Sequence, residues 1–221
     1  INISRLTARQ ESQRAHSMII SQSDENRKRV TEVIARGGVI AFRTDTFYGL
    51  GADPFNASAV QKVKDLKGRE GDKPILVLIS DVEQLDRLIE NRSPAFDKLA
   101  KKFWPGALTI IGEATGRLPG ELTAGTRSVG VRLPDDDGVR SLVRACGGAL
   151  TATSANLSGE PAARSAAEAL KYFGENVLIV DGGATKTDQP STIVNVIGSE
   201  VKLVREGAIP WDEIQVALDG K

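Results

Sequence analysis

The sequence has almost none of the residues that carry nucleophilic catalysis and metal binding in most proteins. Its 221 residues include one cysteine, Cys146, and one histidine, His16. A single cysteine excludes an internal disulfide and a multi-cysteine zinc site, and it is typical of a protein from the reducing cytoplasm. A single histidine argues against a Ser-His-Asp triad and a multi-histidine metal site. We therefore expect a cytoplasmic protein whose side chains form no metal centre.

The chain also lacks an excess of charge, a long apolar run and a glycine-rich nucleotide motif. Lys plus Arg and Asp plus Glu both total 29. This balance excludes nucleic-acid binding through bulk basicity, so a site for a polyanion must be a local patch. No apolar run approaches the ~18 residues of a transmembrane helix, so no membrane partner is expected. Neither the P-loop spacing nor the dinucleotide-binding fingerprint is present, and a nucleotide would need another binding scheme.

Short apolar runs alternate along the chain with stretches that begin at helix-capping residues. Helices are predicted after Ser23, Asn56, Ser93, Asp137 and Ser165, with a short last helix from Pro210. Strands are predicted at residues 39–42, 75–79, 108–111, 129–132, 149–153, 177–180, 192–196 and 201–204. This order indicates a single α/β (α+β) domain around a mixed sheet. We interpret residues 1–17 as a flexible N-terminal extension and residues 18–221 as the domain.

The first polar cluster follows the strand predicted at 39–42. Its sequence is Arg43-Thr44-Asp45-Thr46-Phe47-Tyr48-Gly49-Leu50-Gly51. The hydroxyl groups can donate and accept hydrogen bonds, and the two glycines let a ligand approach the backbone closely. The same residues also suit a turn whose Thr and Asp side chains bond to their own backbone. The segment alone favours neither interpretation.

The second cluster is basic and surrounds the end of the helix predicted after Asn56. It contains Lys62, Lys64, Lys67, Arg69 and Lys73. In Lys67-Gly68-Arg69 a compact ammonium and a planar guanidinium flank a glycine, which suits a phosphate chain. Alternatively, cations favour the last turn of a helix because of its dipole, and interspersed acids would make this an ordinary charged surface.

Two further clusters lie at strand ends later in the chain. Residues 151–159 offer small hydroxyl and amide groups that could bind a nucleotide or an amino acid, although such residues also initiate turns. The fourth cluster combines Asp181-Gly182-Gly183, Gln189-Pro190-Ser191-Thr192 and Arg205-Glu206-Gly207. These segments suit the rim of a ligand site and equally suit hairpin turns.

Eight motifs in a fixed order connect these clusters. They are Thr44–Gly51, Lys67-Gly68-Arg69, Phe103–Gly106 with Leu108-Thr109, Val129–Pro134, Thr153–Gly159, Asp181–Gly183, Ser191-Thr192 and Val204–Gly207. Together they resemble the YrdC-like family, and within it the bacterial threonylcarbamoyl-AMP synthases of the TsaC type. Each motif is weak by itself, but eight in the family's order over residues 18–210 are specific.

The resemblance implies a twisted mixed sheet, flanked by helices, with a positively charged groove. It implies an enzyme that joins L-threonine, bicarbonate and ATP, the last with Mg²⁺, into threonylcarbamoyl-AMP and pyrophosphate. The implied partners are tRNA and the transfer proteins of the TsaD, TsaB and TsaE type. Such chemistry depends on positioning and charge neutralisation rather than on a histidine or cysteine nucleophile, which suits this sequence.

The resemblance also assigns roles to particular residues. The implied catalytic residues are Lys67 and Arg69, and the implied ATP-binding residues are Lys67, Arg69, Lys73, Ser128, Ser154, Asn156 and Arg205. The implied threonine-binding residues are Thr46, Tyr48, Arg132 and Ser191. Three positions depart from the family pattern: Arg43 replaces a frequent proline, Lys73 a frequent asparagine, and Leu78 a histidine of some members.

A second hypothesis belongs to a different class of function. An RNA-binding or ribosome-associated module, including one for double-stranded RNA, could use the same basic groove for a sugar-phosphate backbone. The charge density between Lys62 and Lys73 favours it, whereas aromatic residues, at 5% of the chain, form no stacking platform. A diverged YrdC-like protein with another small-molecule activity is a third hypothesis, and the complete Lys67-Gly68-Arg69 and Ser154-Ala155-Asn156 motifs argue against it.

Overall fold

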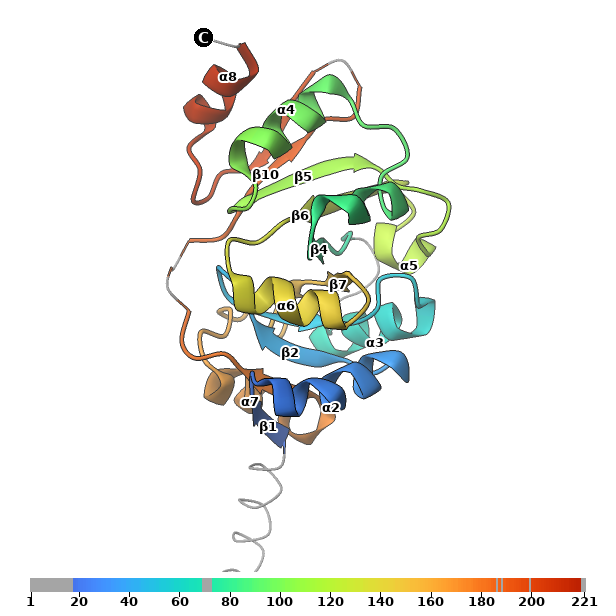
Figure 1. The fold of residues 1–221 in the computed structure, drawn as a ribbon, viewed down its shortest axis with the longest axis vertical. Coiled ribbons are helices and arrows are strands. Elements are labelled where there is room, and N and C mark those ends of the chain that lie inside the picture. The colour runs from blue at the N-terminus through green and yellow to red at the C-terminus, as the bar shows by residue number, and fades with distance from the viewer. Residues whose placement is uncertain (1–17, 69–72, 186, 188, 199, 220–221) are drawn as a thin grey trace, which may run out of the picture.

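Two mixed β-sheets with helices on their faces form the framework of the protein (Figure 1). The computed structural model describes residues 18–68, 73–185, 187, 189–198 and 200–219. The extension expected at residues 1–17 therefore lies outside the described residues. The mixed sheets and flanking helices confirm the α/β fold expected from the sequence.

The helices and strands have the following bounds. The strands are β1 (Ile19–Ser21), β2 (Ile40–Arg43), β3 (Tyr48–Gly51), β4 (Val77–Ile79), β5 (Leu108–Glu113), β6 (Ser128–Arg132), β7 (Ala149–Thr151), β8 (Thr153–Ser154), β9 (Leu178–Asp181), β10 (Thr192–Asn195) and β11 (Lys202–Arg205). The α-helices are α2 (Asp24–Ala35), α3 (Ala57–Lys67), α4 (Pro94–Phe103), α5 (Gly120–Thr123), α6 (Asp137–Ala145), α7 (Ala166–Phe173) and α8 (Trp211–Asp219). Two 3₁₀ helices span Val82–Arg87 and Gly174–Asn176.

Helix starts agree closely with the sequence because a cap is a local interaction. Four predicted caps are confirmed. In each, the capping side chain accepts a hydrogen bond from an N–H in the first turn of the helix; the residues are Ser23, Asn56, Ser93 and Ser165. One cap was misplaced by a residue: Asp136, and not Asp137, accepts from the Val139 N–H at 3.0 Å and begins α6. Either of two neighbouring aspartates can cap a helix, so the sequence pattern alone does not show which of Asp136 and Asp137 is the N-cap of α6.

Two strands were not predicted, and one predicted strand is divided. Residues 48–51 form β3, which pairs antiparallel with β2 and β8, although the sequence suggested only a loop or turn there. Two of the four residues of β3 are glycines, which are rare in strands, so the sequence pattern does not predict a strand here. Pairing with β2 and β8 stabilises it in the folded protein. β1 was also missed. The strand predicted at 149–153 is split into β7 and β8 around Ala152.

The division at Ala152 joins the two sheets. The five-stranded sheet has the order β1-β9-β2-β3-β8, and the six-stranded sheet has the order β11-β10-β5-β6-β4-β7. β7 pairs with β4 and β8 pairs with β3, so one short segment belongs to both sheets. The Ala152 N–H donates to the Leu76 carbonyl at 2.8 Å, and the Thr151 N–H donates to the Ala52 carbonyl at 2.9 Å. These bonds fix how the two sheets meet.

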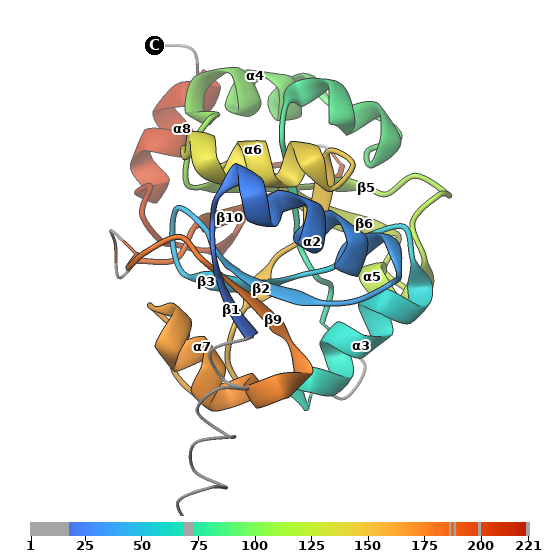
Figure 2. The same cartoon turned by 60° about the horizontal axis from the view of Figure 1, so that its bottom comes forward.

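The helices cover the sheets in separate groups (Figures 1 and 2). α4 packs on β5 and lies beside α8, while α7 packs on β2 and β9. α2 and α6 lie side by side, with α6 against β4 and β7. Apolar residues of α2 and α6, among them Val30 and Val143, form a core cluster with Phe42 and Leu150. Within the described ranges, no helix combines the length and apolar character needed to cross a bilayer.

The turn after β11 packs tightly against the segment that leads into β10. The Ala208 N–H donates to the Pro190 carbonyl at 2.9 Å, and the Gly207 N–H donates to Thr192 Oγ1 at 2.9 Å. A Cβ added to Gly207 would lie 2.2 Å from the Pro190 oxygen and 2.7 Å from the Ser191 carbonyl carbon. Only glycine fits this approach of two backbones.

We therefore expect Gly207→Ala to lower the free energy of unfolding by about 1–3 kcal/mol, as overpacking usually does. Gly116→Ala is the matched control because nothing lies within 4 Å of the added methyl group. Urea denaturation of both variants tests the prediction. Equal stability of the two would show that the backbones at Gly207 can separate at no cost.

Candidate active site

A cavity of about 570 Å³ opens where the two sheets meet. Its walls contain residues from all four polar clusters of the sequence, which the fold brings together. The polar side chains among its lining residues are Thr44, Thr46, Tyr48, Lys73, Thr109, Arg132, Thr153, Ser154, Asn156, Glu160, Ser191 and Arg205. Apolar residues such as Ile75 and Ile193 complete the lining. A concave site of this size and composition is typical of small-molecule binding.

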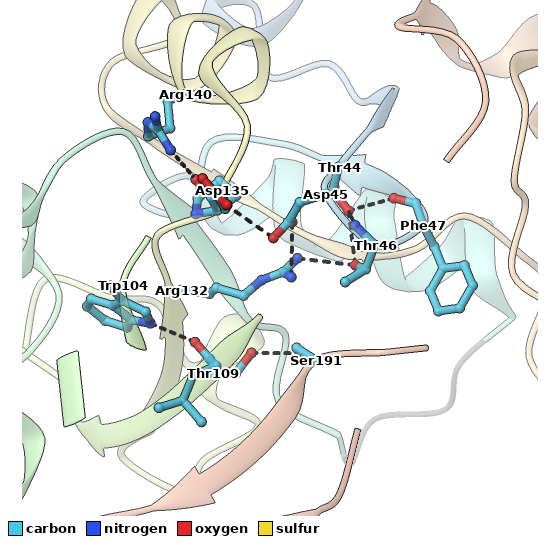
Figure 3. Close-up of polar contacts among 12 residues, drawn as sticks. Thr44, Asp45, Thr46, Phe47, Trp104, Thr109, Arg132, Asp135, Arg140 and Ser191 are labelled. Atoms are coloured by element: carbon cyan, nitrogen blue, oxygen red, sulfur yellow. Dashed lines mark hydrogen bonds and ion pairs between the residues drawn. The ribbon is translucent and has the colours of Figure 1, made fainter. Parts of the chain in front are cut away.

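Arg132, the last residue of β6, places a positive charge in the interior. Its side chain is 3% exposed, and its Nη1 lies 3.0 Å from Asp45 Oδ1 (Figure 3). Nη2 donates to Thr46 Oγ1 at 3.4 Å, whereas Nε and Nη1 have no partner in hydrogen-bond geometry. Burial lowers the pKa of Arg132, and the charge of Asp45 opposes this shift. The guanidinium therefore keeps donors that an anionic ligand could satisfy.

The turn between β2 and β3 holds Thr46 beside this guanidinium. Thr44 Oγ1 donates to the Phe47 carbonyl at 2.6 Å and accepts from the Thr46 N–H at 3.1 Å. The two threonine hydroxyls are 3.1 Å apart. Both interpretations of this cluster thus apply, because the turn satisfies its own backbone and also presents a hydroxyl group to the cavity.

A second guanidinium approaches from β11. Arg205 Nη2 donates to the Ser191 carbonyl at 2.8 Å and to Ser191 Oγ at 3.3 Å. Ser191 Oγ is 2.9 Å from Thr109 Oγ1 (Figure 3). Burial lowers the pKa of Arg205, and so does the nearby charge of Arg132. Two cations that destabilise each other in a cavity form an electrostatic site for an anion.

Lys67 lies behind the cavity wall and is not one of its lining residues. The side chain is buried at the end of α3, and Nζ donates to Asn156 Oδ1 at 2.8 Å, to the Asn156 carbonyl at 3.0 Å and to the Ser154 carbonyl. Ser154 Oγ donates to the same Asn156 Oδ1 at 2.6 Å. In this structure Lys67 therefore positions the segment that presents Ser154 and Asn156.

The other residues singled out in the sequence are placed as follows. Lys73 is exposed on the cavity rim. The Tyr48 ring lines the cavity, but its hydroxyl donates to the Gly183 carbonyl at 2.8 Å and Asp181 Oδ1 at 3.1 Å. Burial and the Asp181 charge raise the pKa of Tyr48. Ser128, at the opposite end of β6 from Arg132, pairs with Thr126 at 2.8 Å and is not a lining residue. Arg69 lies outside the described residues.

Two residues that contact cavity-lining side chains were not singled out from the sequence. Asp45, which pairs with Arg132, was noted only as part of a turn, and Thr109 only as part of a motif. Their partners are far along the chain, so no local pattern indicates the contacts. The signal for Thr109 was a polar residue inside an apolar strand, between the buried Leu108 and Ile110.

The charges around the cavity suit an anion. Lys73, Arg132 and Arg205 carry positive charge among the lining residues, and Glu160 carries negative charge. In the described parts of the chain, no group of three or more His, Cys, Asp or Glu side chains could hold a metal ion. The three cations suit direct contact with carboxylate or phosphate oxygens.

Comparison with known families decides the classification. The family model Sua5_yciO_yrdC, described as "Telomere recombination", matches residues 32–207. The chain belongs to this family. Its members with similar sequences include the "Threonylcarbamoyl-AMP synthase" of Pyrococcus abyssi, which is 34% identical over 186 residues and covers 84% of this chain. The protein of the same name from Thiobacillus denitrificans is 37% identical over 168 residues and covers 76% of this chain.

The family also contains solved structures of this shape. That of P. abyssi Sua5 complexed with L-threonine superimposes with a TM-score of 0.86 at 31% identity over 91% of this chain. The lengths of the family members differ. The chain spans 55% of the Pyrococcus relative and 89% of the Thiobacillus relative.

Two of the residues expected to depart from the family pattern, Arg43 and Leu78, lie behind the cavity wall. Arg43 Nη2 pairs with Asp136 Oδ2 at 2.7 Å and thereby ties the end of β2 to the cap of α6. Leu78 is fully buried in the core cluster that contains Val143. Neither residue lines the cavity, so neither substitution directly changes its surface.

The buried Lys67 ammonium donates hydrogen bonds to three acceptors. We expect Lys67→Met to lower the free energy of unfolding by about 1–3 kcal/mol, because buried acceptors then lose their donor. Lys73→Met removes the same charge from an exposed rim position and should change stability by less than about 0.5 kcal/mol. Chemical denaturation compares the two. Equal stabilities would contradict the positioning role of Lys67.

Proposed function

We propose that this protein is a threonylcarbamoyl-AMP synthase, which uses L-threonine, bicarbonate and ATP. The observation that carries the proposal is the pair of guanidinium groups, the buried Arg132 and the more exposed Arg205, in a cavity whose other polar groups are mostly small hydroxyls and amides. Family relatives with this name, and a relative whose structure holds L-threonine, support the same assignment.

The cavity offers complementary groups for both larger substrates. Arg132 suits the amino acid carboxylate because a guanidinium binds a carboxylate with two donors, and Thr46 adds a hydroxyl beside it. Ser154, Asn156, Lys73 and Arg205 are assigned to ATP. Ser154 and Asn156 would bind the nucleotide through hydrogen bonds, whereas Lys73 and Arg205 would neutralise phosphate charge.

The proposed reaction needs no protein nucleophile. The threonine amine and bicarbonate combine to a carbamate with loss of water. A carbamate oxygen then forms a bond to the α-phosphorus of ATP, and the bond to the bridging oxygen breaks, so pyrophosphate leaves with the electron pair. Arg205, Lys73 and, by resemblance, Lys67 and Arg69 would stabilise the charge that develops on the phosphates. Lys67 would have to leave its present partners to do so.

Mg²⁺ would enter this reaction with its substrate. The described residues include no carboxylate cluster that could hold the ion, so it would arrive on the phosphates of ATP. We further propose that the product passes to transfer proteins of the TsaD, TsaB and TsaE type, which modify tRNA.

The contacts of the basic cluster make an RNA-binding module the weaker alternative. Lys62 Nζ donates to the Gly37 carbonyl at 2.8 Å, and Lys64 and Lys67 are buried. Lys64 and Lys67 therefore contribute little to an exposed basic surface, so Lys62 and Lys73 are the exposed cations of this cluster among the described residues. Phosphate contacts by exposed cations dominate non-specific RNA binding.

The proposal predicts that pyrophosphate forms only when ATP, L-threonine and bicarbonate are all present. A pyrophosphate-release assay with each substrate omitted in turn, combined with detection of the AMP adduct, tests it. Equal ATP turnover without threonine would overturn the synthase assignment and indicate an ATPase. RNA binding without any adduct formation would favour the RNA module.

Arg132→Lys should weaken the use of threonine more than the binding of ATP, because lysine keeps the charge but loses the planar pair of donors. The loss of about 1.5–3 kcal/mol for a charged hydrogen bond corresponds to a rise in the threonine KM of about tenfold to a hundredfold. Arg117→Lys, at an exposed position, is the control. Weakened ATP titration with an unchanged threonine KM would contradict the assignment of Arg132.

A further inference from the structure

Two ion pairs of opposite polarity join the turn after β2 to the segment between β6 and α6. Arg43, at the end of β2, pairs with Asp136 at 2.7 Å. Asp45, in the turn, pairs in the reverse sense with Arg132 at 3.0 Å, and its other carboxylate oxygen accepts from the Asp135 N–H at 3.4 Å (Figure 3). Each segment thus supplies one cation and one anion. A shift of one segment along the other would bring like charges together, so the two pairs select one alignment.

The two ion pairs differ in their relation to the cavity. Arg132 lines the cavity, whereas neither Arg43 nor Asp136 is a lining residue. The side chains of Arg43 and Asp136 are 13% and 11% exposed, so solvent screens their attraction less than that of a surface pair. The Arg43–Asp136 pair can therefore hold the turn without occupying space that a ligand needs.

The partner of Arg43 is itself held in place at both carboxylate oxygens. Asp136 Oδ1 accepts from the Val139 N–H at 3.0 Å as the cap of α6, and Oδ2 faces Arg43. The carboxylate cannot rotate without losing one of these interactions. Arg140 Nη1 donates to the Pro134 carbonyl at 2.6 Å and fixes the preceding segment to the same helix. Arg43 is therefore bound to a rigid part of the fold.

Arg43 and Tyr48 form the base of the turn, because they are partners in the antiparallel register of β2 and β3. The Tyr48 hydroxyl donates to the Gly183 carbonyl at 2.8 Å, which anchors this side of the turn to the segment after β9. The ion pair of Arg43 anchors the other side to the cap of α6. Between them, Thr46 Oγ1 lies 3.4 Å from Arg132 Nη2, a long hydrogen bond that a small displacement of the turn would break.

The fold leaves room for the Arg43 side chain beside β9. A Cβ added to Gly182 would lie 3.1 Å from Arg43 Cβ and 2.9 Å from Arg43 Nε. Contacts this close would force the arginine side chain to move. Glycine at position 182 thus lets Arg43 pass the end of β9 on the way to α6.

We propose that Arg43 is a positioning residue whose ion pair with Asp136 holds the turn at residues 44–47, so that the Thr46 hydroxyl lies beside Arg132. The ion pair touches no ligand and acts through the turn. In its effect on L-threonine the inference rests on the proposed function, and it adds to that function a determinant of substrate affinity outside the cavity.

Hydrogen exchange of the full chain, read by mass spectrometry in the peptide that contains residues 44–47, measures the turn without any ligand. Arg43→Met keeps the aliphatic stem and removes the charge. We expect exchange in this peptide to become about threefold faster or more, because a segment opens more easily when it loses a tertiary contact. Arg43→Lys keeps the cation and should exchange within about twofold of the wild type.

Calorimetric titration with L-threonine measures the effect on the cavity. Arg43→Met should weaken L-threonine binding about threefold to tenfold, the range expected when a neighbouring contact in a network is lost. Arg43→Lys should restore binding to within about twofold of the wild type. In pyrophosphate release, Arg43→Met should raise the threonine KM and leave the ATP KM within about twofold.

A double-mutant cycle tests whether Arg43 acts through Asp136. Asp136→Asn removes the charge but keeps a side-chain oxygen for the cap of α6. It should weaken L-threonine binding in the same way as Arg43→Met, and the double variant should be no weaker than the weaker single variant. Fully additive effects would show that the two residues act separately. Should Arg43→Met not fold, Asp136→Asn provides both measurements.

Two control variants separate positioning from general destabilisation. Arg92→Met breaks an ion pair of 2.6 Å with Asp86, and neither residue lines the cavity. Ser165→Ala removes the cap of α7 and lowers stability without contacting the turn. Both variants should keep the exchange of the turn and the affinity for L-threonine within about twofold of the wild type. An equal loss of affinity in Ser165→Ala would overturn the positioning role.

The outcomes distinguish this role from the proposed function. Unchanged exchange in Arg43→Met, or an equal rise of the threonine and ATP KM, overturns the positioning role, while threonine-dependent pyrophosphate release by the wild type would still support the synthase. Faster exchange with unchanged threonine binding overturns the step from the turn to the ligand. Faster exchange in Arg43→Met, together with a wild type that neither binds L-threonine nor releases pyrophosphate, supports the hold on the turn and overturns the proposed function.

Discussion

A positive charge held almost out of contact with water imposes the main constraint on this structure. Transferring the Arg132 guanidinium from water into the interior costs several kcal/mol unless other groups compensate. Asp45 supplies the opposite charge and Thr46 one acceptor, both from the turn between β2 and β3. Arg132 itself ends a strand of the other sheet. The charge is therefore tolerated only when both sheets have formed and met, which couples the binding cavity to the completed fold.

The protein compensates the buried charge of Arg132 only in part. Two nitrogen atoms of Arg132 lack hydrogen-bond geometry, and Arg205 brings a second cation that makes the charged state of both less favourable. A sequence selected for stability alone would replace such groups by apolar residues of similar volume. Their presence is expected when an anion binds there, because the ligand then supplies the interactions that the protein leaves open.

The structural features that the sequence predicted correctly depend on short-range interactions. Helix caps such as Ser23 and Ser165 bond to residues three positions away, so the local sequence specifies them. The order of motifs indicated which loops share a site. The sequence could not show that Lys67 turns toward Ser154, because that contact depends on how α3 packs against a segment 87 positions later. The Thr109–Ser191 pair likewise exists only because β5 and β10 are neighbours.

The continuous backbone through Ala152 has a consequence for how ligands are received. Because β7 and β8 are consecutive pieces of one chain in two different sheets, the walls of the cavity cannot separate as independent bodies at this point. The spacing between Ser154 on one side and the residues beside β4 on the other is set before any ligand arrives. Less conformational entropy is then lost when a ligand binds, because the backbone already fixes the distance between the two walls.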